Sequence, residues 1–169
     1  AIYDIKKGED GRSPLYLRNA ATKFKYADPS TLGTRGRHDV IVAESHSFGR
    51  IMLGALYAIW HKMYEYNVLR GLNQKHALVV SRNLFSKYLL TAITIVPKTP
   101  RFFQSFARSL MWVAQQDNPI YHKLIREILI DWKIVGEIDA QSDINDGVEV
   151  IKLSEEMEIG ILAHNPLYE

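Results

Sequence analysis

The central segment of the chain reads Glu44-Ser-His-Ser-Phe-Gly-Arg-Ile-Met-Leu-Gly-Ala-Leu-Tyr-Ala-Ile-Trp-His-Lys-Met-Tyr-Glu-Tyr66. Its apolar residues recur every three or four positions, at Phe48, Ile51, Met52, Ala55, Leu56, Ile59, Trp60 and Met63. This spacing places them on one face of an α-helix. We therefore expect a central helix whose apolar face lies in the core, with Ser45 or Ser47 capping its first turn.

Three further helices are predicted after this segment. The second begins with Ser81 as its N-cap and ends before Pro97. The third opens at Thr99-Pro100, where a capping hydroxyl precedes a proline at the first helical position. The fourth starts at Asp117-Asn-Pro119 and continues to about residue 136. Because short connections join consecutive helices, we expect an antiparallel helical bundle and a mainly α fold.

The two ends of the chain differ from this helical body. Residues 1–40 contain closely spaced glycines and prolines, which predict an irregular N-terminal segment. Residues 148–153 and 158–162 are rich in β-branched residues, a pattern typical of two short strands or a short C-terminal β-hairpin. The chain is thus divided into a helical domain, residues 1–136, and an acidic extension, residues 137–169.

Composition limits the classes of protein that fit. With 169 residues, of which 47% are hydrophobic, the chain can bury one sizeable core. The absence of cysteine excludes disulfides and thiolate zinc ligands. No run of about eighteen apolar residues occurs, so no membrane span is expected.

Charge is distributed unevenly. Residues 137–169 carry nine acidic residues and one lysine, so the remainder of a chain with net charge +2 carries about +10. The basic residues of the body are scattered and match no known nucleic-acid-reading motif. Nucleic acid is therefore the least favoured partner.

The order of several motifs resembles the helical C-terminal lobe of the thermolysin-like zinc metallopeptidases. His46 is followed by Gly49 and by Ala55-Leu-Tyr57, which places Tyr57 eleven residues beyond the histidine, as in the family pattern. The other matching elements, in chain order, are Leu17-Arg18, Asp28-Pro29, Gly33, residues 87–94, Thr99, Phe103, Ala107 and Ile134-Val-Gly136. The resemblance covers about residues 3–136.

The resemblance implies roles for five residues. His46 would donate a hydrogen bond to the oxyanion formed when water attacks a peptide carbonyl. Glu44, or Asp39 as second candidate, would hold its imidazole in position. Arg18 would bind a substrate carbonyl beyond the scissile bond, and Leu17 would line the adjoining side-chain pocket. The implied substrate is a peptide or protein, and the implied location is secreted or periplasmic.

Two departures from the family pattern affect the metal and the histidine. None of the six histidines lies in a His-Glu-x-x-His motif, and His61 with Glu65 supplies too few ligands for zinc. Ile41 stands where the family has an aspartate, five residues before His46. We therefore expect no metal site or cofactor in this chain, zinc on a separate N-terminal lobe of the complete enzyme, and no activity from the chain alone.

Simpler alternatives stay open. His46 can be a helix-start residue without chemistry, Arg18 can be a surface or ion-pairing residue, and His61 with Glu65 can be an ordinary pair on one helix face. At the level of function, the alternative to half of a metallopeptidase is a non-catalytic helical domain that binds a partner protein.

Overall fold

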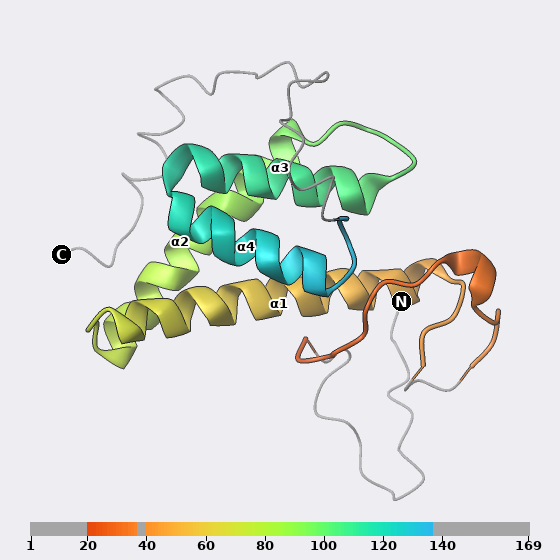
Figure 1. The fold of residues 1–169 in the computed structure, drawn as a ribbon, viewed down its shortest axis with the longest axis horizontal. Coiled ribbons are helices and arrows are strands. Elements are labelled where there is room, and N and C mark those ends of the chain that lie inside the picture. Colours follow the sequence, from red (N-terminus) through yellow and green to blue (C-terminus); the bar gives the residue numbers. More distant parts are fainter. Residues whose placement is uncertain (1–19, 37–39, 137–169) are drawn as a thin grey trace, which may run out of the picture.

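A computed structural model of the chain describes residues 20–36 and 40–136 (Figure 1). Within these ranges the chain is mainly helical, as predicted, and contains no strand. The elements are the 3-10 turn η1 (Pro29–Thr31) and the helices α1 (Ser45–Leu69), α2 (Gln74–Ile95), α3 (Phe102–Asp117) and α4 (Pro119–Asp131). Leu17, Arg18, Asp39 and the predicted hairpin lie outside the described residues.

Helix α1 buries the face that its periodicity predicts. Ile51, Ala55, Ile59 and Met63 are almost fully buried, which confirms α1 as a core helix. The predicted serine cap is not formed, because Glu44 is the N-cap residue and makes no side-chain cap. The buried hydroxyl of Ser47 instead accepts a hydrogen bond from the backbone N–H of Val42 at 3.3 Å.

Two of the predicted helix starts are wrong. Helix α2 begins at Gln74, where the Asn73 side chain caps it by accepting from the N–H of His76 at 2.9 Å. Ser81 is not a cap, because its side chain is fully buried inside the bundle. Helix α3 begins at Phe102, after Arg101 as N-cap, so Thr99 does not cap it either.

Helix α4 starts as predicted and ends earlier than predicted. Its first residue is Pro119, which confirms the start predicted at Asp117-Asn-Pro119, and the Asn118 side chain caps it by accepting from the N–H of Ile120 at 2.9 Å. The helix stops at Asp131 because the backbone reverses at Lys133, whose φ is 57°. Ile134 and Val135 are nevertheless buried, so their apolar character reflects the core and not a longer helix.

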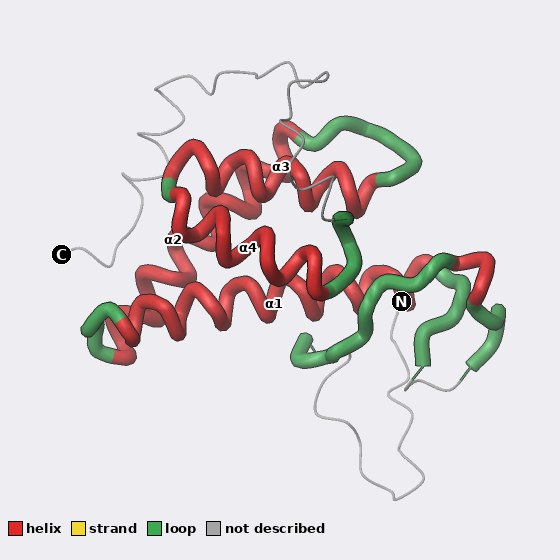
Figure 2. Tube along the Cα trace, in the orientation of Figure 1, coloured by secondary structure: helices red, strands yellow, loops and turns green. Residues whose placement is uncertain are grey.

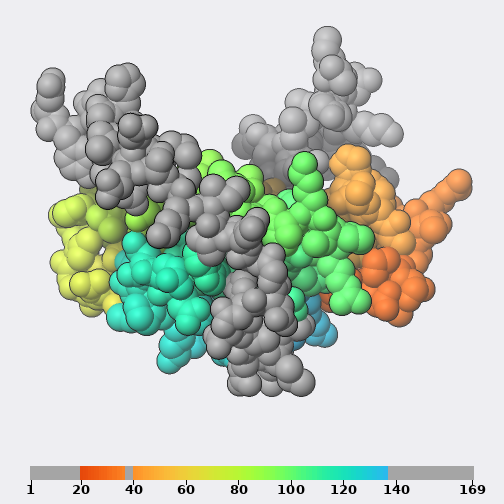
Figure 3. Space-filling view, turned by 90° about the horizontal axis from the view of Figure 1, so that it is seen from above, coloured from red at the N-terminus to blue at the C-terminus, as the bar shows by residue number. Residues whose placement is uncertain are grey.

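The four helices form a ring of contacts around one core. Helix α1 packs against α2 and α4, and α3 packs against the same two helices. Figures 1 and 2 show α3 and α4 on the same side of α1. The start of α1 and part of residues 20–36 lie at one end of the molecule (orange in Figure 3), whereas residues 21–25 lie against the middle of α1, near Gly54 and Tyr57. The bundle is thus closed by contacts between its first and last helices.

A buried amide joins three of these helices. Asn67, in the last turn of α1, is 2% exposed. Its Nδ2 donates to the carbonyl of Met63 at 3.0 Å and to Oγ of Ser81, in α2, at 2.9 Å. Its Oδ1 accepts from the hydroxyl of Tyr121, in α4, at 2.9 Å. Each of these polar groups has a partner, so the burial of the amide is compatible with a stable core.

A second polar contact joins α2 to the end of α3. The Tyr88 hydroxyl donates to Oδ2 of Asp117 at 2.6 Å, and Lys87 Nζ lies 3.3 Å from Oδ1 of the same carboxylate. Burial of the Tyr88 hydroxyl raises its pKa well above the usual range, and the hydrogen bond to Asp117 adds to this shift. The tyrosine therefore stays a neutral donor, and the carboxylate is held by two groups from α2.

We expect Tyr121→Phe to lower the free energy of unfolding by about 1–3 kcal/mol, because it leaves the buried Oδ1 of Asn67 without its donor. Chemical denaturation measures the change. Tyr64→Phe is the matched control, since the Tyr64 hydroxyl has no hydrogen bond among the described residues. The control should change stability by less than about 0.5 kcal/mol. Equal effects of the two substitutions would show that the Asn67 contact does not stabilise the fold.

Candidate functional site

The two catalytic residues predicted from the sequence lie in contact at the start of α1. Nδ1 of His46 is 2.7 Å from Oε1 of Glu44. The extended backbone of the N-cap residue Glu44 lets its carboxylate reach the first turn of the helix. A carboxylate only accepts hydrogen bonds, so Nδ1 of the imidazole carries the proton and Nε2 is the atom left for a ligand.

This pair is open to solvent. The side chains of His46 and Glu44 are 72% and 52% exposed, respectively. A hydrogen bond between exposed groups contributes little stability, so the pair matters for orientation more than for the fold. At the start of α1, the described residues therefore place one solvent-exposed imidazole that is oriented by a carboxylate.

The side chains that could bind a metal ion are spread apart in the described residues. Within residues 20–36 and 40–136, no three His, Asp or Glu side chains are grouped closely enough to hold a metal ion. His61 Nδ1 lies 3.6 Å from Oε1 of Glu65, which also pairs with Lys62 at 3.2 Å. His61 and Glu65 thus form an ordinary i,i+4 pair on one helix face. The described residues do not supply the set of ligands that a zinc ion needs.

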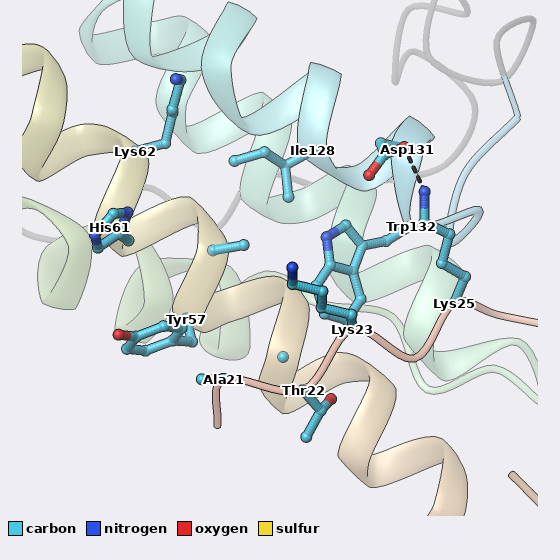
Figure 4. Close-up of a pocket in the computed structure, with 12 residues that line it drawn as sticks. Ala21, Thr22, Lys23, Lys25, Tyr57, His61, Lys62, Ile128, Asp131 and Trp132 are labelled. Carbon is cyan, nitrogen blue, oxygen red and sulfur yellow. Dashed lines mark hydrogen bonds and ion pairs between the residues drawn. The ribbon is translucent and has the colours of Figure 1, made fainter. Parts of the chain in front are cut away.

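A hollow of about 520 Å³ lies elsewhere, between α1, the end of α4 and residues 21–25 (Figure 4). We call it the Trp132 pocket. Its lining on α1 includes Gly54, Tyr57, Ala58 and His61. The sequence alone does not reveal this pocket, because its walls come from three separate parts of the chain.

The strand-like segment that closes this pocket is tied to α4. The backbone N–H of Tyr26 donates to the carbonyl of Trp132 at 3.0 Å. Lys25 Nζ lies 2.6 Å from Oδ1 of Asp131. Residues 22–26 also alternate between inward and outward side chains, with Lys23 and Lys25 exposed. In the sequence, the alternation of Thr, Lys, Phe, Lys and Tyr over residues 22–26 indicates an extended segment that packs one of its faces against the helices.

Gly54 allows α1 to approach the pocket wall closely. A Cβ atom at this position would lie 2.5 Å from Cη2 of Trp132 and 2.9 Å from Oγ1 of Thr22. Neither distance is compatible with normal packing, so a glycine is required for the present position of the indole ring. Thr22 Oγ1 is itself buried and has no hydrogen-bond partner among the described residues. In the sequence, a glycine inside an apolar helix is a second signal for this pocket, because it indicates that another part of the chain approaches the helix closely.

The lining carries more positive than negative charge. It includes Lys23, Lys25 and Lys62, against Asp131 as the acidic residue. Lys25 pairs with Asp131, and Lys62 pairs with Glu65. Lys23 has no ion-pair partner in the part of the chain that the structure describes. The pocket therefore presents an ammonium group that is not neutralised by a described neighbour.

Comparison of the chain with models of protein families, with curated proteins and with solved structures finds no match. The likeness to thermolysin-like peptidases therefore rests on the motifs in the sequence. Among the described residues, no helix is both long and apolar enough to cross a membrane.

We expect Gly54→Ala to destabilise the protein by about 1–3 kcal/mol, because the added methyl group collides with the Trp132 ring. In an unconstrained helix the same change would stabilise by about 0.5–1 kcal/mol, so the sign of the effect is diagnostic. Thermal or chemical unfolding of the single variants and of the double variant with Trp132→Leu measures the coupling. The penalty should shrink in the Trp132→Leu background. A stabilising Gly54→Ala would contradict the close contact.

Proposed function

We propose that this chain is the helical C-terminal lobe of a zinc-dependent peptidase similar to thermolysin. The observation that carries the proposal is the 2.7 Å contact between Glu44 and Nδ1 of His46 at the start of α1. The order of the motifs around His46 supports it. The substrate is a peptide or protein, and the zinc site belongs to a separate N-terminal lobe, since the described residues do not form one.

In this proposal His46 stabilises negative charge on the substrate. Glu44 orients the imidazole through Nδ1, and in the doubly protonated imidazole Nε2–H can donate to the oxyanion of a tetrahedral intermediate. The N-terminus of α1 adds a favourable partial positive charge for that oxyanion. The present exposure of the pair would end when the second lobe and the substrate cover it, and exclusion of water would strengthen the contact.

The remaining parts of the proposal concern the ends of the chain. Arg18 and Leu17 contribute to substrate binding, the helices are arranged as an antiparallel bundle, and residues 148–162 form a hairpin in the acidic extension. Residues 1–136 act as the lobe. The chain alone is inactive, because no described group of residues can activate water through a metal.

A non-catalytic helical domain that binds a partner protein is the second candidate. Large apolar side chains are exposed on and beside α2, with Leu90 59% exposed, Ile93 52% and Phe102 47%. Leu90 and Ile93 are one turn apart and share a helix face. A full-length coding sequence with His-Glu-x-x-His before Ala1 would support the peptidase, and its absence would favour this second function.

In the complete enzyme, we expect His46→Ala to lower kcat/KM for peptide hydrolysis by about 10²–10³-fold, because it removes one donor to the oxyanion. His61→Ala is the matched control, since His61 is also exposed on α1 and also pairs with a glutamate. The control should stay within about threefold of the wild-type value. A His46→Ala enzyme that also stays within that margin would contradict the proposed role.

A further inference from the structure

We propose that the Trp132 pocket binds a carboxylate attached to an apolar body, with the ammonium group of Lys23 contacting the carboxylate. This inference is independent of the peptidase proposal, because it uses neither His46 nor a metal. Gly54, the first residue of α1 to line the pocket, lies eight residues beyond His46, about 12 Å along the helix axis. The pocket would therefore be a second binding site on the same helix.

The floor and walls suit an apolar body. Gly54, Ala58 and Ile128 present small or aliphatic surfaces, and Tyr57 and Trp132 add aromatic rings. In Figure 4, Trp132 lies toward the Lys25–Asp131 end of the hollow, and Tyr57 and His61 lie toward the other. A volume of about 520 Å³ is within the range of pockets that hold small organic ligands. Burial of an aryl or alkyl group here would supply most of the affinity.

The charges at the rim select an anion. Among the lysines of the lining, Lys25 and Lys62 already have carboxylate partners, whereas Lys23 has none among the described residues. An added carboxylate would meet the Lys23 ammonium beside an apolar wall, where a charge-assisted contact is stronger than in open water. A ligand with a positive charge would meet repulsion from the same groups.

The pocket walls are already fixed in the absence of a ligand. Trp132 is 7% exposed and is held by contact with Gly54. Residues 21–26 are fastened to the end of α4 by the Tyr26 backbone bond and by the Lys25–Asp131 ion pair. A preorganised site loses little conformational entropy on binding. The ligand therefore does not have to build the hollow that it occupies.

Binding of 4-phenylbutyrate to the purified chain tests this site, by isothermal titration calorimetry or ligand-observed NMR. We expect a Kd of about 1 mM or tighter, as for a small ligand with few contacts. The matched probe is 4-phenylbutylamine, which has the same apolar body and the opposite charge. The amine should bind at least about fivefold more weakly. Equal binding of both probes, or no binding of the acid below about 10 mM, would overturn the proposal.

Two substitutions locate the binding on the molecule. Lys23→Met keeps the length of the side chain and removes its charge, and we expect it to raise the Kd of the acid at least about fivefold. Lys98→Met is the control on an exposed lysine outside the pocket, and it should leave the Kd unchanged. Ala58→Leu fills the hollow and should abolish binding, with circular dichroism confirming the fold. Unchanged affinity in both Lys23→Met and Ala58→Leu would place the ligand elsewhere.

The carboxylate can belong to a free organic acid or to the C-terminus of a peptide. A tripeptide ending in phenylalanine, compared with its C-terminal amide, separates these sources. Binding of the tripeptide with loss in the amide would support a peptide C-terminus as the ligand. Binding of 4-phenylbutyrate alone would support a small organic acid.

Discussion

The buried side chain of Asn67 is the contact on which the arrangement of the helices depends. Its amide is satisfied by the backbone of α1, by Ser81 of α2 and by Tyr121 of α4. Loss of one of these hydrogen bonds destabilises the fold more than a mismatch between apolar side chains does, because apolar side chains can repack. Only one register of the three helices satisfies every group, so the network selects that register among alternatives of similar apolar burial.

The candidate sites lie on the same helix as this network. The network holds the end of α1 and the start of α4, while the contact between Gly54 and Trp132 holds the middle of α1 against the end of α4. Helices α1 and α4 are thus held together at two positions along their length. The Trp132 pocket opens along this pair, and His46 occupies the opposite end of α1 from Asn67. One helix therefore carries the network, the pocket and the candidate oxyanion donor in succession.

Features set by local sequence could be predicted, and those set by tertiary contacts could not. The apolar face of α1, the start of α4 at Pro119 and the contact of Glu44 with His46 depend on residues a few positions apart. Ser81 has the propensity of a cap, yet it lies buried against Asn67 inside a helix that begins at Gln74, after the N-cap Asn73. The pocket was missed because residues 21–25, 54–62 and 128–132 meet only in the folded chain.

Hydrogen exchange of the Asn67 side-chain amide, followed by NMR, tests the central role of this contact most directly. Its Nδ2 protons are bonded to Met63 and Ser81, so they should exchange only through global unfolding, as slowly as the most protected backbone amides of α1. Asn73 provides the reference, because it caps α2 through Oδ1 on an exposed surface and its amide protons should exchange rapidly. Exchange of the Asn67 amide as fast as that of Asn73 would contradict the account.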